Sequence, residues 1–378
     1  MKTRNSSVKK ILLIGGGHSH VEVVRKYGLA PIPGAEVTLV SESHQTAYSG
    51  MVPGLIAGHY SIDECHIDLE TLCKKSHTNF ILGKVEKIYP ETSFVVTNSG
   101  TEINFDIASI DTGSIPNAKA VPGAETWSTP VKPINRLMEE FDTFEKKLKG
   151  KPNSCTSCIT AVGGGAASVE LLLAIHYRLL HAKIANIKLT LITDRSDILL
   201  EHSLAVRRRV RRYLYQSGVT ILTNARVTEI CENSIVTESH GTTVSHFTIL
   251  GTGASAPDWP KACGFSTDSS GFILTDENLL TLGFKNIFAV GDIGSILRKK
   301  YPKSGVYAVK QGPLLFKNIQ SLIEGKSLSK FQPQRRALAL ISLGIKKAVA
   351  SRGVFYASGA FVWFWKNLID KRFMRRYQ

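Results

Sequence analysis

The sequence predicts an α/β fold in which one parallel-sheet unit occurs twice and a smaller C-terminal module of strands and a helix follows. Three repeated features support this prediction. A glycine-rich turn follows an apolar strand at residues 15–20 and again at 163–168. A Thr-Gly pair follows another apolar strand at 112–113 and at 252–253, and a segment with hairpin-like alternation precedes each pair. The chain therefore contains two similar domains, with the second inserted in the first.

Each repeat has the order strand, glycine turn, helix, strand. This is the βαβ arrangement of Rossmann-like units, which bind dinucleotides. The predicted elements are a strand at 8–14, a helix at 21–27 and a strand at 36–40 in the first unit, and a strand at 157–162, a helix at 169–180 and a strand at 188–193 in the second.

The two glycine turns have the composition of a pyrophosphate-binding site. The N-terminus of the helix that follows offers unpaired N–H groups and a positive dipole end. Gly15 permits the tight turn and Gly17 lets the phosphates approach, whereas a third glycine would serve packing of the helix on the strand. His20 and Ser168 replace that third glycine, and we expect this to loosen packing without removing phosphate binding. The candidate nucleotide-binding residues here are Gly15, Gly16, Gly17, His18, Ser19, Thr112, Gly113, Gly163, Gly165 and Gly253.

An acidic side chain at the end of the second strand of such a unit binds the adenosine ribose. Glu42 is the candidate in the first unit, offset by one residue from the strand end, and Asp194 is the candidate in the second. An acid at that position favours NADH, whereas the adjacent Arg195 could accept the extra phosphate of NADPH. The sequence leaves this choice open.

The composition allows more than one folded domain and favours an anionic partner. The chain has 378 residues, of which 43% are hydrophobic and 21% charged. The net charge of +16 suits dinucleotide phosphates, an anionic membrane surface or nucleic acid. A short basic start leaves no room for an export signal, and no apolar run reaches the roughly 18 residues that span a bilayer. The six cysteines are scattered, which suits a reducing compartment, so we expect a cytoplasmic or peripheral membrane protein.

The segment 285–296, "KNIFAVGDIGSI", indicates which nucleotide each unit binds. Its apolar strand ends in Ala-Val-Gly-Asp, and here the chain resembles the two-dinucleotide-binding-domain flavoproteins, the pyridine-nucleotide oxidoreductases. The resemblance implies that Gly291 and Asp292 contact the ribityl and phosphate part of FAD. It also implies an FAD domain in two parts, 1–125 and 266–329, an NAD(P)H domain at 126–265, and a different C-terminal module at 330–378.

The region 41–60 contains no cysteine, so it lacks the redox-active pair that disulfide reductases of this class carry there. Cys155 and Cys158 have redox spacing but lie next to the second glycine turn, where we interpret them as ordinary thiols. The sequence resembles the type II NADH:quinone oxidoreductases, the sulfide:quinone reductases and, most closely, the FAD-dependent oxidoreductases fused to or beside selenophosphate synthetase. The motifs that carry the closest resemblance are "GGGHSHV", "YSGMVPGLIAGHY", "GVYAVKQGP" and "FVWFWKNLIDKRFMR".

The resemblance implies an FAD-dependent NAD(P)H dehydrogenase with a quinone as acceptor. It places Lys310 and Gln311, on a helix at 305–319, beside the quinone side of the flavin, and Glu170 near flavin and nicotinamide. Lys310 could instead be a solvated lysine, and Glu170 a first-turn acid that stabilises its helix. The alternatives are a sulfide:quinone-type or selenium-linked flavin oxidoreductase, and, in another class, a non-enzymatic membrane- or nucleic-acid-associated protein on this fold.

Two basic segments bear on partners. The helix at 206–214, "VRRRVRRYL", lacks a nucleic-acid-binding motif, so we interpret it as a solvated face and expect no nucleic-acid partner. The histidines have no metal-ligand spacing, so no metal is expected.

In the last helix, the apolar side predicted at 100° per residue contains Phe361, Val362, Trp365, Leu368, Ile369 and Phe373. With its basic residues, this helix is predicted to lie on an anionic membrane surface; the alternative is packing on its own domain or on a second subunit of a homodimer.

Overall fold

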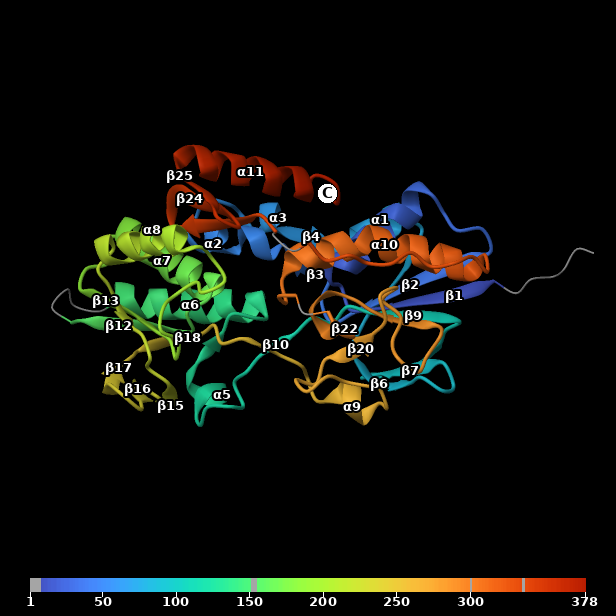
Figure 1. The fold of residues 1–378 in the computed structure, drawn as a ribbon, viewed down its shortest axis with the longest axis horizontal. Coiled ribbons are helices and arrows are strands. Elements are labelled where there is room, and N and C mark those ends of the chain that lie inside the picture. Colours follow the sequence, from blue (N-terminus) through green and yellow to red (C-terminus); the bar gives the residue numbers. More distant parts are fainter. Residues whose placement is uncertain (1–7, 151–154, 300, 335–336) are drawn as a thin grey trace, which may run out of the picture.

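The computed structural model describes residues 8–150, 155–299, 301–334 and 337–378. Figure 1 shows two lobes, each built on a twisted sheet, with the C-terminal module lying across their upper side. The two sheets are parallel and Rossmann-like, which confirms the predicted α/β fold class.

The first sheet has five strands in the order β21-β9-β1-β2-β5, and every neighbouring pair is parallel. The chain leaves this sheet after β9 and returns only with β21, so the whole second sheet lies between them in the sequence. A small antiparallel sheet, β6-β7-β8, packs beneath. The bounds are β1 Lys9–Ile14, β2 Ala35–Ser41, β5 Asn79–Leu82, β6 Val85–Tyr89, β7 Phe94–Thr97, β8 Glu102–Asn104, β9 Ile107–Ile110 and β21 Ile287–Ala289.

The second sheet repeats this plan in the order β11-β18-β12-β13-β14, again with parallel neighbours. Its own antiparallel sheet is β15-β16-β17. The bounds are β11 Thr129–Pro130, β12 Ser157–Val162, β13 Ile187–Ile192, β14 Val219–Leu222, β15 Val227–Cys231, β16 Ser234–Thr237, β17 Gly241–Val244 and β18 Phe247–Leu250. Because helices and the small sheets cover both faces, the central strands are apolar along most of their length.

Two helices position the glycine turns. α1, His18–Leu29, follows the first turn and packs along α10, Gly305–Ile323. α7, Ala166–His181, follows the second turn and contacts strand β23 of the C-terminal module. The other helices are η1 Ser49–Met51, α2 Val52–Ile56, α3 Ile62–Cys65, α4 Leu69–Lys75, α5 Ala124–Trp127, α6 Ile134–Lys149, α8 Leu204–Gln216, α9 Trp259–Ala262 and η2 Gly291–Ile293.

Short strands join the parts. The two crossovers between the lobes pair as an antiparallel ribbon of β10, Ile115–Pro116, and β19, Ala254–Ser255. In the first lobe β3, Gln45–Ala47, pairs with β4, His66–Asp68, and β20, Ile273–Thr275, with β22, Gly294–Ile296. The C-terminal module consists of β23 Ala339–Leu343, β24 Ile345–Arg352, β25 Phe355–Gly359 and α11 Ala360–Met374. No helix in the described ranges is both long and apolar enough to cross a membrane.

Candidate active site

The first glycine turn has the backbone that only glycine adopts readily. Gly15 has a φ of +95°, and a Cβ on it would lie 2.6 Å from the carbonyl oxygen of Asp111. Strand β1 therefore passes directly into α1, whose first amides point to the carboxyl end of the sheet, where ligands of open α/β sheets bind.

His20, at the third-glycine position, does not loosen the packing as we expected. Its side chain is fully buried, and its Nδ1 lies 2.7 Å from the carbonyl oxygen of Gly15 while its Nε2 lies 2.8 Å from the hydroxyl of Ser109. Burial lowers the pKa of His20 to about 4, so the ring is neutral at pH 7. Since a carbonyl only accepts, Nδ1 donates to Gly15 and Nε2 accepts from Ser109. The imidazole thus fills the gap between helix and strand with both nitrogens paired.

A carboxyl group that the sequence reasoning missed lies at the N-terminus of α1. Asp111 is 4% exposed, and its Oδ2 accepts hydrogen bonds from the amides of Ser19 at 2.9 Å and His20 at 3.4 Å. Burial raises the pKa of Asp111 to about 6, and burial lowers the pKa of the adjacent His18. Comparison of the two repeats could have identified this residue. The residue before the Thr-Gly pair is Asp111 in the first unit and Gly251 in the second.

The structure brings Asp292 to the same edge of the first sheet. Its carboxylate is 7% exposed and accepts hydrogen bonds from Lys132 Nζ at 2.8 Å and Ser114 Oγ at 3.1 Å. Gln311 is buried, and its Oε1 accepts from the amide of Gly291 at 2.7 Å, so it fixes the turn that carries Asp292. Lys132, which follows β11 at the start of the second unit, was not predicted.

The remaining predictions for this unit lie at its surface. Glu42 directly follows β2 and is exposed, as is Thr112. Gly113 has a φ of +75° with open space around it. Lys310 is half-buried on α10 and forms no hydrogen bond or ion pair with the described part of the chain.

The first unit fits a dinucleotide. Its glycine turn leads to first-turn amides that hold an anionic group, and Asp292 offers a carboxylate to hydroxyl donors. The Nε2 atom of His18 is buried and has no hydrogen-bond partner among the described residues, so a polar group of a ligand would satisfy it. The chemistry of these groups matches the pyrophosphate and polyol parts of FAD.

The second unit opens on a cavity of about 980 Å³, lined by the second glycine turn and by Asp194, Arg195, Thr252 and Gly253. Gly163 has a φ of +116° and a Cβ on it would lie 2.4 Å from the carbonyl oxygen of Gly251. A Cβ on Gly165 would meet no atom within 4 Å, so this edge of the turn faces open space. The hydroxyl of Thr252 is buried without a partner in the described ranges. These features fit a second nucleotide.

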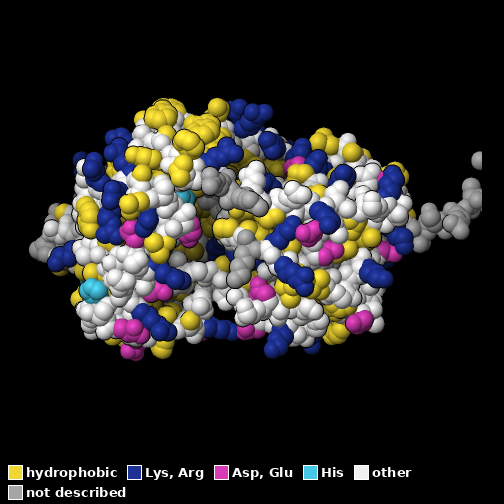
Figure 2. All heavy atoms as spheres, viewed as in Figure 1, with side chains coloured by type: hydrophobic (Ala, Val, Ile, Leu, Met, Phe, Trp, Pro, Cys, Tyr) yellow, Lys and Arg dark blue, Asp and Glu magenta, His cyan; other side chains and the backbone are white. Residues whose placement is uncertain are grey.

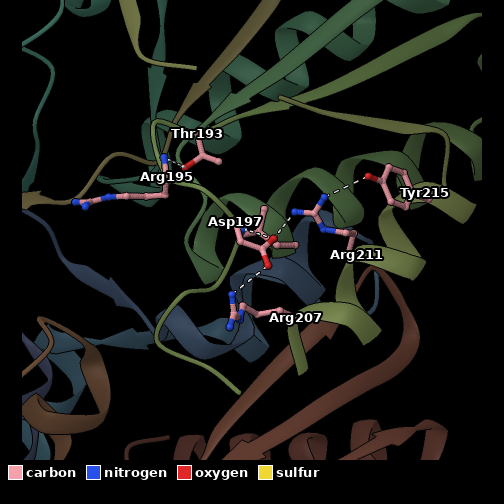
Figure 3. Close-up of polar contacts among 7 residues, drawn as sticks. Thr193, Arg195, Asp197, Arg207, Arg211 and Tyr215 are labelled. Atoms are coloured by element: carbon pink, nitrogen blue, oxygen red, sulfur yellow. Dashed lines mark hydrogen bonds and ion pairs between the residues drawn. The ribbon is translucent and has the colours of Figure 1, made fainter. Parts of the chain in front are cut away.

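Figure 3 shows polar contacts of Thr193, Arg195 and Asp197, which follow β13 and line this cavity, and of side chains on α8. Asp194 and Arg195 are exposed at the rim, with Oδ1 and Nε 3.6 Å apart. Asp197 is largely buried and pairs with two arginines of α8, with Arg207 at 3.2 Å and with Arg211. The sequence predicted that the arginine-rich helix is a solvated face. This is only partly right, because Arg207 and Arg211 pair with Asp197 within the protein.

The third group of polar residues lies where the C-terminal module meets both units. The amide of Ser342, on β23, donates to Glu170 Oε1 at 2.7 Å. Glu170 lies in the second turn of α7 rather than the first, and burial raises its pKa to about 7. Lys366 and Asp370, both on α11, form a buried ion pair at 2.5 Å, and Lys366 Nζ also donates to the carbonyl oxygen of Gly50. The sequence reasoning missed this pair.

Comparison with known proteins agrees with this architecture. The type II NADH:quinone oxidoreductase of Staphylococcus aureus is 24% identical over 389 residues, which cover 96% of this chain and 94% of that protein. The sulfide:quinone oxidoreductase from the hyperthermophilic bacterium Aquifex aeolicus has the same fold, with a TM-score of 0.83 at 21% identity, covering 98% of this chain and 91% of that one. NDH2 from Plasmodium falciparum, in complex with NADH, gives a TM-score of 0.79 at 14% identity, covering 97% and 96%.

The family model described as pyridine nucleotide-disulphide oxidoreductase matches residues 9–312. The matched part includes both glycine turns, Asp292 and the first two turns of α10. The chain therefore belongs to the pyridine nucleotide-disulphide oxidoreductase family, whose cofactors are the FAD and NAD(P)H predicted from the sequence.

Proposed function

We propose that the protein is an NAD(P)H:quinone oxidoreductase that holds FAD in the first unit and NAD(P)H in the second, and works at a membrane surface. When bound, FAD would supply the chemistry that moves two electrons from the nicotinamide to an acceptor. The chain's own part is to bind and orient. We assign the amides of α1 and α7 to the two pyrophosphates and Asp292 to the FAD polyol.

The observation that carries this proposal is the set of large apolar side chains that α11 exposes to solvent. The inner side of this helix includes the buried pair Lys366 and Asp370, whereas Phe361, Phe364 and Leu368 on its outer side are 64%, 64% and 65% exposed. Val362 and Phe373, predicted to share the outer apolar side, are buried instead. Exposing large apolar side chains to water is costly and marks an interaction surface. A helix that exposes large apolar side chains together with Arg372 is suited to the edge of a lipid layer.

Charge around this surface supports a membrane as its partner. Figure 2 shows hydrophobic side chains gathered over α11 and the β24–β25 end of the module, with Lys and Arg side chains beside them. Val354 and Phe355 at that end are 69% and 78% exposed. Exposed basic residues on this module include Lys346, Lys347, Arg352, Arg372, Arg375 and Arg376. Each basic residue near an anionic leaflet contributes about 1 kcal/mol of binding.

A quinone rather than a sulfur substrate is supported by the positions of the thiols. Cys158 is the second residue of β12, and the glycine turn begins after the last residue of this strand. At 3.3 Å per residue, Cys158 therefore lies about 16 Å from the start of the turn. Cys65 and Cys73 are fully buried, and burial raises the pKa of each thiol to about 12. None of these thiols is both reactive and close to the nucleotide turns. The name of the relative from Staphylococcus aureus includes NADH and a quinone, and the name of the one from Aquifex aeolicus includes a quinone together with sulfide.

Reduction of a quinone to a quinol also requires protons, and Glu170 is suited to supply one. Its pKa near 7 lets it both hold and release a proton at neutral pH. Lys366 and Asp370 act on this carboxyl electrostatically, with opposite signs. We therefore assign Glu170 as proton donor on the acceptor side, with Lys366 and Asp370 as positioning residues.

The decisive experiment separates the two half-reactions. The full-length protein is reconstituted with FAD and titrated without oxygen, first with NADH or NADPH and then with a short-chain quinone. We expect bleaching of the flavin absorbance by the nicotinamide and its full return with the quinone. Return with sulfur compounds but not with quinone would contradict the proposed acceptor.

Membrane docking is tested separately, by sedimentation with anionic liposomes. Phe364→Ser combined with Leu368→Ser should reduce liposome binding while leaving activity with a soluble quinone within twofold. Leu29→Ser combined with Leu180→Ser is the matched control, because these side chains are 73% and 61% exposed elsewhere on the protein. Equal liposome binding by both double variants would refute docking through α11.

A further inference from the structure

We propose that Asp111 competes with the pyrophosphate of FAD for the amide groups at the N-terminus of α1, so that this side chain controls loading of the cofactor. The inference rests on the proposal that the first unit binds FAD. It concerns a residue to which neither the glycine-turn pattern nor the Asp292 motif gives a role.

The first observation is where the carboxyl group lies. Its Oδ2 accepts from the amides of Ser19 and His20, the second and third residues of α1, which are the donors that a helix N-terminus offers to phosphate. A Cβ on Gly17 would lie 2.2 Å from the carboxyl carbon of Asp111, and a Cβ on Gly291 would lie 2.2 Å from its Oδ1. The carboxyl group therefore fills the narrow space between two glycines at the mouth of the turn.

The second observation is the contrast with the inserted unit. Asp111 directly follows β9, and Gly251 directly follows β18, the strand at the equivalent place in the second sheet. Gly251 lines the cavity beside the second glycine turn, and a Cβ on it would lie 2.0 Å from Ser168 Oγ. The same backbone position thus presents no carboxylate to the helix of the second unit, whereas it presents Asp111 to the helix of the first.

The third observation is the charge around Asp111. Three elements bring charged or titratable groups to it: α1 with His18, η2 with Asp292, and the segment after β11 with Lys132, whose Nζ lies on Asp292. The pKa of Asp111 is raised to about 6, chiefly by burial and also by Asp292, against the lowering effect of His18 and the two amides. A pyrophosphate beside an ionised Asp111 would add like-charge repulsion. The competition is therefore strongest above pH 6 and weak once Asp111 is protonated.

The test measures FAD binding to the cofactor-free, full-length protein by flavin fluorescence between pH 5 and pH 8. For the wild type, the Kd should rise about tenfold per pH unit above pH 6, because binding then takes up one proton. Asp111→Gly, which copies the second unit, and Asp111→Asn, which keeps the size, should bind FAD more tightly at pH 8 with little pH dependence. Glu91→Gln removes an exposed carboxylate of the same unit and should behave as the wild type.

Circular dichroism of each cofactor-free variant establishes that it is folded, and Asp111→Asn preserves the test should Asp111→Gly unfold. Weaker FAD binding by both folded variants at pH 8, or a pH dependence parallel to that of the wild type, would overturn the inference. Failure of the underlying assignment gives a different result: Asp292→Ala would then bind FAD as tightly as the wild type.

Discussion

Gly165→Val tests the assignment of the second glycine turn without disturbing the fold. Gly165 is the N-cap of α7 with a φ of −79°, which any residue adopts, and a Cβ there meets no protein atom within 4 Å. The added side chain points into the space assigned to the pyrophosphate. Overpacking a well-filled site costs about 1–3 kcal/mol. Because every 1.4 kcal/mol is about tenfold in affinity, NAD(P)H should bind roughly 5- to 150-fold more weakly.

The assay is anaerobic stopped-flow reduction of the FAD-loaded variant over a range of NADH and NADPH concentrations, with FAD content and Tm measured alongside. FAD content and Tm should equal those of the wild type. Gly150→Val is the control, since Gly150 also has an ordinary φ of −88° but lies at the C-cap of α6, outside the cavity. Gly163→Val should instead lower the Tm, because its φ is +116° and its Cβ meets the backbone. Unchanged affinity for both nucleotides in Gly165→Val would refute the assignment.

Three further predictions concern single groups. Asp292→Ala removes charge-assisted hydrogen bonds worth about 1.5–3 kcal/mol, so FAD per chain after gel filtration should fall, and full occupancy would contradict its role. Replacing Cys155 and Cys158 together with serine should leave the rate with a soluble quinone within twofold; a loss of about a hundredfold, or 2.7 kcal/mol, would point to a thiol relay. The pKa of Glu170 is about 7 in the folded protein against an ordinary 4.5, so the stability tied to its proton is full below pH 4.5 and is lost as the pH rises through 7. The Tm of wild type minus that of Glu170→Gln should therefore be lower at pH 8 than at pH 5, and an equal difference would refute the raised pKa.

The parts of the site that the sequence predicted are local patterns. A glycine turn between a strand and a helix, or an aspartate after an apolar strand, is complete within about ten residues. The residues that were missed act through contacts over long separations. Asp111 lies 92 residues from Ser19, Lys132 lies 160 residues from Asp292, and Lys366 lies 316 residues from Gly50. No periodicity or spacing encodes such pairs, because the folded topology alone brings them together.

Two residues of the predicted apolar side of α11, Val362 and Phe373, were placed wrongly for a different reason. The periodicity argument assigns apolar residues to one side of a helix by their spacing alone. In α11 the aromatic and aliphatic residues are spread around the helix, so its hydrophobic pattern is weakly polarised, and the contacts of Lys366 decide which side faces inward. A buried lysine with a carboxylate and a backbone carbonyl as partners keeps its charge paired.

The C-terminal module connects the two units. Tyr377 donates to Glu22 on α1 in the first unit, and Ser342 donates to Glu170 on α7 in the second. A module bound to both helices fixes their relative positions without contributing to either parallel sheet. The inner side of α11 contains the buried Lys366–Asp370 pair among apolar residues, and its outer side exposes Phe361, Phe364 and Leu368. Under the proposed function, the same 15-residue helix would attach the protein to the membrane and border the acceptor site.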